Sequence, residues 1–291
     1  MSLLVKFNVI LILCFGIALV PAHLITQDLL QKNARTQVVQ HARLMMQTAL
    51  ATRGYTNKQI KPLLAERLAE EFLPQTVPAY SATEIFNTLR ETYPAYAYKE
   101  ATLNPTNPRD RTVDWEADVV NAFRSDAKLL EIIGERDAPL GRALYLARPI
   151  TITDPGCLSC HTTPEMTPAS VVKRYGTSGG YGWKLNEIIG AQIVSVPMAV
   201  PLNLARQAHR AMLASLVGVF AFILVLLNVL LWFTIIRPIR QLSQMADEVS
   251  TGNLDVPEVR LNSRGEVGVL AGSFNRMRIS LVKALKMLEE E

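Results

Sequence analysis

Apolar positions dominate two stretches of the chain, one near the N-terminus and one in its last third. The 25 residues from Met212 to Ile236 contain no charged side chain, and 21 of them are apolar. At about 1.5 Å per residue, a helix of this length exceeds the roughly 30 Å hydrocarbon core of a bilayer. Residues 212–236 are therefore predicted to form a transmembrane helix.

The first apolar stretch runs from Phe7 to Ile25 and directly follows Lys6. Its densest part ends at Val20-Pro21-Ala22, where a small residue also suits the cleavage site of a signal peptide. Both interpretations export the segment that follows. We favour an uncleaved transmembrane anchor over residues 1–25, because the second half of the chain has the pattern of a two-helix membrane receptor.

The middle segment, residues 26–211, begins with amphipathic runs and changes after Pro94 to short runs rich in Tyr, Ile, Val and Leu. Ser81-Ala82-Thr83-Glu84 has the form of a capping box. An α+β domain with a long N-terminal helix and an antiparallel sheet is the simplest arrangement. The expected helices are Gln27–Arg53, Asn57–Phe72, Ser81–Tyr93 and Asp114–Arg124, and the expected strands are Ala95–Leu103, Arg142–Ile152 and Lys184–Val196.

The tail, residues 237–291, contains two apolar stripes with heptad spacing, separated by Gly252–Pro257. Two short amphipathic helices cannot bury such stripes alone, so a homodimer is expected. An ordinary juxtamembrane coiled coil is the alternative, and it would also form a dimer. The first stripe comprises Ile239, Leu242, Ala246 and Val249, and the second comprises Val267, Leu270, Phe274, Met277, Leu281, Ala284 and Leu288.

The charge balance argues against nucleic acid as a partner. The chain has 30 Lys and Arg residues against 26 Asp and Glu residues, a net charge of +4 that is dispersed along the sequence. We therefore expect no nucleic acid as partner. Three cysteines are too few for a disulfide-stapled domain, and two of them, Cys157 and Cys160, directly precede His161.

The pentapeptide Cys157-Leu158-Ser159-Cys160-His161 has the pattern that attaches a c-type haem covalently. Its spacing matches two thiols to the two vinyl groups and lets the adjacent imidazole reach the iron. A redox dithiol would be expected within a βαβ unit, and a zinc site would need further Cys or His partners. One covalent haem c is therefore expected. Because bacteria attach haem c outside the cytoplasm, we expect residues 26–211 in the periplasm and the tail in the cytoplasm.

A thioether or an imidazole at the other axial position of the iron would give a low-spin haem, so both methionine and histidine residues are candidates for this position. Met46 is preferred as the second metal ligand, followed by Met45 and His41, since all three lie on a predicted amphipathic helix. Met166 and Met198 are further candidates. The alternative role of each methionine is to fill the core.

Four side chains are candidate neighbours of the haem. Arg53 and Arg148 suit its propionates, whereas Tyr175 and Trp183 suit contact with its ring. Each has an ordinary alternative, as a surface arginine or a packed aromatic residue.

Short segments spread over residues 40–198 match one family: Arg53-Gly54-Tyr55-Thr56, Pro74-Gln75-Thr76-Val77-Pro78-Ala79-Tyr80, Tyr98-Lys99-Glu100, Asn104-Pro105-Thr106-Asn107, Asp114-Trp115-Glu116, Cys157–His161 and Gly182–Glu187. With them, the middle segment resembles bacterial c-type haem sensor modules with a PAS-like fold, formerly classed as a domain of unknown function. The resemblance implies a periplasmic single-haem domain in which Cys157 and Cys160 are thioether anchors and His161 is an axial ligand.

The tail resembles a HAMP domain at Pro238, at Gly252-Asn253-Leu254 and at Glu266-Val267-Gly268. This resemblance implies a parallel four-helix bundle formed by two chains. A HAMP unit converts a small helix displacement at the membrane into a rearrangement of the bundle.

The expected function is that of a dimeric inner-membrane haem sensor, in which a redox change or a small ligand at the iron displaces the helix near Met46. No kinase, cyclase or methyl-accepting segment follows the tail, so a separate cytoplasmic signalling partner is expected. The alternative is a membrane-tethered cytochrome that transfers electrons to or from a periplasmic partner. No catalytic residue is assigned and an enzyme is not expected, because no distal acid–base pair is evident.

Overall fold

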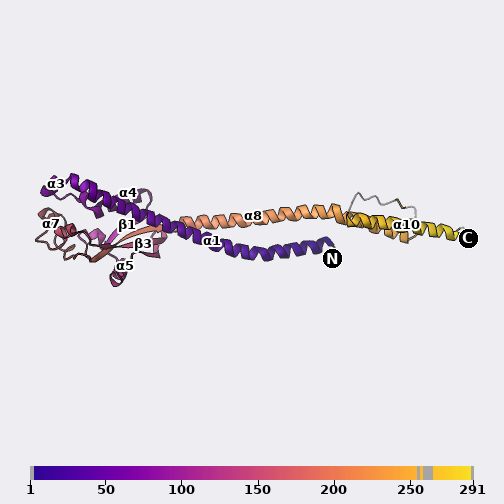
Figure 1. Ribbon diagram of the computed structural model, residues 1–291, viewed down its shortest axis with the longest axis horizontal. Coiled ribbons are helices and arrows are strands. Elements are labelled where there is room, and N and C mark those ends of the chain that lie inside the picture. The colour runs from indigo at the N-terminus through magenta and orange to yellow at the C-terminus, as the bar shows by residue number, and fades with distance from the viewer. Residues whose placement is uncertain (1–2, 254–255, 258–264, 290–291) are drawn as a thin grey trace. The chain divides into compact units, whose positions relative to one another are not determined.

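The computed structural model describes residues 3–253, 256–257 and 265–289 of the chain (Figure 1). Two compact units divide the chain: Met1–Ile25 with Arg210–Glu291 form one, and Thr26–His209 form the other. All described strands belong to the Thr26–His209 unit. This unit therefore contains the α+β domain that the sequence predicts.

Helices and strands are interleaved along the described chain. The α-helices are α1 (Leu3–Tyr55), α2 (Lys61–Leu63), α3 (Ala65–Glu70), α4 (Pro78–Thr92), α5 (Asp114–Ser125), α6 (Leu158–His161), α7 (Ala169–Tyr175), α8 (Ala199–Leu231), α9 (Arg237–Ser250) and α10 (Glu266–Glu289). Short 3-10 helices are η2 (Pro74–Thr76), η3 (Pro108–Asp110) and η4 (Pro155–Cys157), and π-helices are η1 (Thr56–Ile60) and η5 (Trp232–Ile236). The strands are β1 (Ala97–Thr102), β2 (Ile132–Ala138), β3 (Gly141–Thr151) and β4 (Ile188–Pro197).

The four strands form one antiparallel sheet in the order β1-β4-β3-β2. Val194 in β4 lies opposite Tyr98 in β1 and Leu146 in β3, which fixes the register of the three strands that the sequence predicts. The sequence does not predict β2. β2 is an edge strand that pairs with β3 alone, and edge strands often carry charged residues. Only its first two residues, Ile132 and Ile133, are large and apolar, so the sequence shows no strand pattern there.

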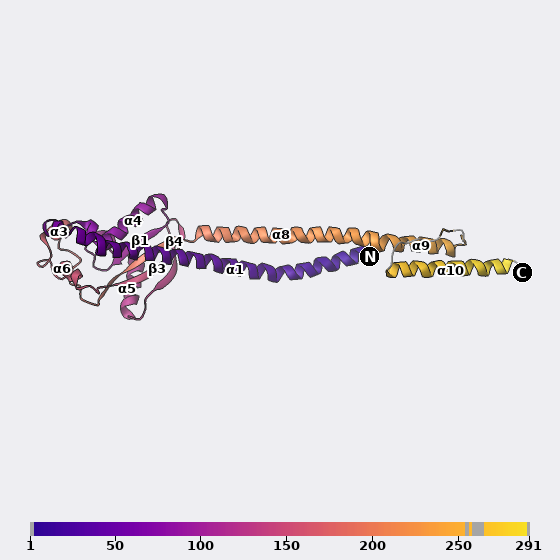
Figure 2. The ribbon, with the colours of Figure 1, turned by 45° about the horizontal axis from the view of Figure 1, so that its top comes forward.

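Helices cover both faces of the sheet, with α1 and α4 on one face and α5 on the other (Figure 2). Alternate residues of β4 point to the two faces of the sheet. Val194 and Val196 pack with α1 and α4, whereas Ala191 and Ile193 pack with α5. Burial on both faces explains why β4 is a nearly continuous apolar run in the sequence.

The helix boundaries differ from the prediction in three places. The helix expected over Asn57–Phe72 is divided into η1, α2 and α3, because the backbone leaves the helical conformation at Leu64. The segment containing Pro21 continues without a break, so the expected anchor and the expected amphipathic helix are one helix, α1. The capping-box prediction is wrong: α4 begins at Pro78, and the Ser81 hydroxyl donates to the Gln75 carbonyl at 2.8 Å. Proline is favoured at this first helical position because its φ is already helical and no N–H is needed there.

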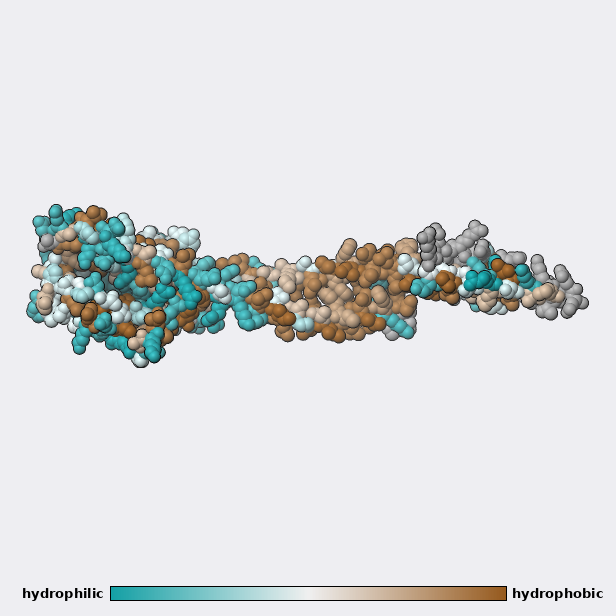
Figure 3. All heavy atoms as spheres, in the orientation of Figure 1, coloured by the Kyte–Doolittle hydropathy of each residue, from teal (hydrophilic) through white to brown (hydrophobic). Residues whose placement is uncertain are grey.

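Two helices are long and apolar enough to cross a membrane, and they lie within Leu3–Leu63 and Ala199–Ser250. Their exposed apolar side chains give the mainly hydrophobic surface seen in Figure 3. Asn8 and Asn228 exchange two side-chain hydrogen bonds of 2.8 Å each, and Phe15 stacks on Phe220 with ring centroids 3.9 Å apart. These contacts align the beginning of α1 with α8.

The tail forms the two amphipathic helices that its heptad spacing predicts, α9 and α10. Leu242 and Val249 are buried, together with Ala271 of α10. Other stripe residues are exposed, namely Ile239, Leu270, Met277 and Leu281. Leu254 and the side chain of Leu288 lie outside what is described. The two helices of one chain thus leave part of their apolar surface uncovered.

Candidate functional site

The Cys157–His161 motif lies in the connection from β3 to β4, where the chain turns into a short helix. The Asp154 carboxylate accepts a hydrogen bond from the Gly156 N–H at 2.8 Å, and Pro155 begins η4, which leads into α6. This turn agrees with the loop expected from Asp154-Pro155-Gly156. Cys157 ends η4 in helical backbone and Cys160 lies in α6, and residues three apart in helical backbone share one face. Burial raises the pKa of the Cys157 thiol, and the nearby Asp154 adds to this.

The imidazole of His161 is held through one of its two nitrogens. Its Nδ1 lies 2.7 Å from the Gly180 carbonyl oxygen, to which it donates, and 3.3 Å from the Thr106 hydroxyl. Burial lowers the pKa of His161, while the hydrogen bond to Gly180 opposes the shift. The lowered pKa favours the neutral ring, in which Nδ1 carries the proton and Nε2 keeps a lone pair that a metal ion could accept.

Two loops that are distant in sequence build the support for His161. The Asn104 side chain accepts from the Gly180 N–H at 3.1 Å and donates to the Tyr181 carbonyl at 2.9 Å. Gly180 has a φ of +85°, and a Cβ there would lie 1.9 Å from the Thr106 hydroxyl oxygen. Only glycine fits this conformation and space. The sequence assigns no role to Asn104, Thr106 or Gly180, although the Gly179-Gly180 pair and the polar loop at 104–107 mark both loops.

Trp183, a predicted contact of the haem ring, lies against His161. The two rings stack with centroids 3.8 Å apart and an angle of 12° between their planes. The backbone N–H of Trp183 donates to the His161 carbonyl at 3.2 Å. The indole Nε1 is buried and has no hydrogen-bond partner among the described groups. A buried N–H without a partner is costly, so a bound group with an acceptor at its edge, such as a haem propionate, would suit this position.

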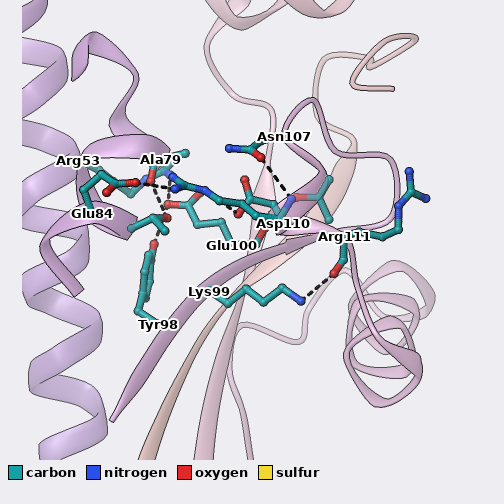
Figure 4. Close-up of polar contacts among 12 residues, drawn as sticks. Arg53, Ala79, Glu84, Tyr98, Lys99, Glu100, Asn107, Asp110 and Arg111 are labelled. Carbon is teal, nitrogen blue, oxygen red and sulfur yellow. Dashed lines mark hydrogen bonds and ion pairs between the residues drawn. The ribbon is translucent and has the colours of Figure 1, made fainter. Parts of the chain in front are cut away.

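Arg53 extends from the last turn of α1 to the buried carboxylate of Glu100 on β1, with which it forms an ion pair (Figure 4). The Tyr98 hydroxyl donates to the same carboxylate at 2.7 Å. Although burial opposes the shift, Glu100 raises the pKa of Arg53. The charge of Arg53 in turn lowers the pKa of Cys157, against the larger effect of burial. Arg53 thus has a carboxylate partner within the domain, and its role as a haem neighbour stays a prediction.

The other two predicted neighbours have partners elsewhere. Arg148 binds the Glu131 carboxylate with its Nη2 at 2.9 Å, and Arg43 of α1 binds the same carboxylate. Both arginines lower the pKa of Glu131, against an opposing effect of burial. Tyr175 ends α7 and meets Phe72 edge-on, with ring centroids 5.9 Å apart. The described contacts bring neither Arg148 nor Tyr175 to His161.

The candidates for the second axial ligand differ in burial. Met46 has no exposed surface and packs in the core between α1, α4 and the sheet, in a cluster without any residue from 152–187. Its packing therefore supports the alternative role as core filler rather than the preferred role as ligand. Met45 is half-buried beside the same cluster, and His41 is exposed. Met198 is in the core and Met166 is exposed.

These residues are chemically suited to a covalently held haem. Two thiols on one helical face would attach the vinyl groups, and the neutral His161 would offer Nε2 to the iron. Trp183 and Arg53 would provide a hydrogen-bond donor and a positive charge nearby. No group of three or more His, Cys, Asp and Glu residues able to hold a metal ion alone occurs in the described chain.

An α+β domain with this motif, joined to two apolar helices and an amphipathic tail, defines the class of membrane-associated haem-protein domains followed by a HAMP domain. The chain belongs to the Tll0287-like family, whose model matches residues 31–197, and a HAMP domain model matches residues 230–283. No curated protein matches the chain. A solved structure, "Crystal structure of the cyanobacterial heme-protein Tll0287", is similar at 15% identity and a TM-score of 0.40, covering 52% of this chain and 94% of that chain.

Proposed function

We propose that this protein is a membrane-bound sensor that carries one haem c on Cys157 and Cys160 and transmits a signal through its HAMP domain. The observation that carries this proposal is the hydrogen bond of 2.7 Å from Nδ1 of His161 to the Gly180 carbonyl, in a histidine that directly follows Cys160. It leaves Nε2 available as an axial ligand. When bound, the haem supplies a redox-active iron with a second axial position.

Covalent attachment needs no other reactant than the thiols and the vinyl groups. Each S–H bond breaks as a C–S bond forms, and the hydrogen moves to the neighbouring vinyl carbon. In bacteria this attachment takes place outside the cytoplasm, so the Thr26–His209 unit would be periplasmic and the HAMP domain cytoplasmic. The beginning of α1 would then remain as an inner-membrane anchor.

Transmission from the domain to the membrane is supported by chain continuity. The helix α1 carries Val38 and Met46 in the core of the domain and Asn8 in its apolar beginning. The central strand β4 ends at Pro197, and α8 begins at Ala199. A displacement within the domain therefore has two helical routes to the membrane.

A homodimer is supported by the apolar surface of the tail. Ile239, Leu270, Met277 and Leu281 are each more than 40% exposed although they occupy heptad positions. A second copy would cover them in a parallel bundle. A separate cytoplasmic partner would then recognise the rearranged bundle. The proposal assigns the protein no enzymatic role.

Haem content is the first test. The full chain, produced with a cytochrome-maturation system, should give one haem per chain in a pyridine haemochrome assay. Cys157→Ser combined with Cys160→Ser should abolish the covalent pigment, whereas Cys14→Ser should not. Absence of covalent haem in the unaltered chain would refute the proposal.

Signal transmission is tested in membranes. Cysteines introduced as Leu242→Cys or Leu270→Cys, in a chain with Cys14→Ser, should crosslink between copies to different extents in oxidised and reduced membranes. Identical crosslinking in both states, together with normal haem content, would contradict the sensor role.

A tethered electron carrier is the second candidate, and one observation favours it. Cys157, Cys160 and His161 are each only half-buried, so the edge of an attached haem would be accessible to a redox partner. Stopped-flow mixing with a periplasmic donor distinguishes the two functions. Rapid exchange that is unaffected by deletion of Ser243–Glu291 would favour the carrier.

A further inference from the structure

A cavity of about 370 Å³ lies beside the edge strand β1, between α4, η3 and α5. It shares no lining residue with the support of His161, which uses Asn104, Thr106, Gly180 and Trp183. Four cationic side chains but only two carboxylates line it. The cations are Arg90, Lys99, Arg109 and Arg136, and the carboxylates are Asp110 and Glu116.

Two of the cations have carboxylate partners within the domain. Lys99 donates to Glu116 at 2.6 Å and to the Arg111 carbonyl at 2.7 Å, and Figure 4 shows Lys99 extended toward Arg111. Arg109 pairs with Glu84 at 2.5 Å. These pairs neutralise part of the cavity wall and hold its shape.

The other two cations have no carboxylate within ion-pair distance among the described residues. Arg136 of β2 lies over the Trp115 ring, with its guanidinium carbon 4.3 Å from the ring centroid. Arg90 of α4 lines the cavity, is exposed and makes no described ion pair. A guanidinium has a planar set of donors that matches a carboxylate, and stacking on an aromatic ring fixes its orientation.

The lining carboxylates do not compensate these two guanidinium groups. Glu116 is already bonded to Lys99 and to the Val113 N–H. Asp110 lies 3.9 Å from Arg109, and among the described residues it forms no ion pair with Arg90 or Arg136. The wall therefore has an excess of positive charge, with neutral polar groups from Thr83 and Ser195 beside it.

We propose that this cavity binds a small organic anion through its carboxylate groups, with Arg90 and Arg136 as the charged partners and Trp115 as a supporting wall. The volume suffices for a molecule of a few carbon atoms. Because α4 packs on β1 and belongs to the same core cluster as α1, binding there would act on the element that carries the proposed haem signal. The site thus gives the domain a second input beside the haem motif.

Calorimetric titration of the full chain in detergent tests this proposal, with succinate as the probe. We expect saturable binding that Arg90→Gln and Arg136→Gln each weaken at least tenfold, whereas Arg136→Lys, which keeps the charge, weakens it less. Arg67→Gln is the matched control, because Arg67 is exposed on α3 outside the cavity, and it should leave binding unchanged. Succinamide, which has the same shape without charge, should not bind.

Several outcomes would overturn the proposal. They are the absence of succinate binding, equal weakening by Arg67→Gln, and no weakening by either cavity variant. Tighter binding of inorganic phosphate than of succinate would overturn the carboxylate assignment. Unchanged melting temperatures of the variants without ligand show that they fold. The heat signal does not depend on haem, so failure here is separate from failure of the proposed haem sensor.

Discussion

The imidazole of His161 and the indole of Trp183 form a parallel stack, with centroids 3.8 Å apart. The same imidazole is bonded through Nδ1 to the Gly180 carbonyl. The ring is thus held on one face and at one nitrogen, so its remaining nitrogen has a fixed direction before any ligand is bound.

Replacing Trp183 tests this orientation. Trp183→Leu removes the stacked ring, so the free energy of unfolding should fall by about 1 kcal/mol or more. In the haem-loaded protein, the electron paramagnetic resonance lines of the ferric iron should broaden because the imidazole adopts a range of angles. Trp183→Phe keeps a stacked ring and should keep narrow lines. Equal spectra from both variants would contradict a positioning role.

Gly180 should tolerate no side chain. Gly180→Ala combines a positive φ with a clash against Thr106, so it should destabilise the domain by about 2 kcal/mol or more in urea unfolding. Gly176→Ala is the matched control, because Gly176 has a φ of +76° but no neighbouring atom within 4 Å of its Cβ. A loss as large for Gly176→Ala as for Gly180→Ala would assign the effect to backbone strain alone.

Asp110 should make stability depend on pH. Its pKa is raised to about 6 from an ordinary value of 3.8, chiefly by burial, so the folded protein binds a proton more tightly than the unfolded chain. Stability is therefore lost as pH rises from about 4 to 6. Asp110→Asn should be more stable than the unaltered protein by about 2 kcal/mol at pH 7.5 and equally stable at pH 4. Urea unfolding at both pH values measures this, and a pH-independent difference would contradict it.

The pair of Asn8 and Asn228 should fix the alignment of the two apolar helices. Asn228→Leu should weaken their association by about 1 kcal/mol, and adding Asn8→Leu should cost little more because the partner is already lost. With Cys14→Ser, the variants Phe15→Cys and Phe220→Cys together should form a disulfide in membranes, and the asparagine substitutions should reduce it. No crosslink in the chain with both asparagines would contradict this alignment, and so would removal of residues before Ala22 by a signal peptidase.

The sequence predicts well those parts of the fold whose residues carry a repeating pattern. Three strands, α5 and the two tail helices are confirmed, because burial on one or two faces places apolar residues at regular intervals in the sequence. The edge strand β2 has no such regular spacing of apolar residues, since Glu135, Arg136 and Asp137 follow its two isoleucines and Gly134. The start of α4 differs from the predicted capping box at Ser81, because Pro78 begins the helix without a side-chain cap.

The candidate site divides in the same way. Cys157, Cys160 and His161 are adjacent in the chain, and their spacing alone identifies them. The contact of Asn104 with Gly180 joins residues 76 positions apart, and no local pattern encodes it. The sequence does not decide the role of Met46, because a methionine on an apolar helical face has the same pattern whether it contacts a cofactor or the core.

The junction between β4 and α8 has a mechanical consequence. Hydrogen bonds to β1 and β3 secure the strand along both edges, and the Met198 N–H is itself bonded to the Arg142 carbonyl at 3.0 Å. Only Met198 separates the end of β4 from the start of α8, and its backbone N–H is bonded to the sheet. The first turn of α8 is therefore coupled to an inner strand of the sheet without an intervening loop.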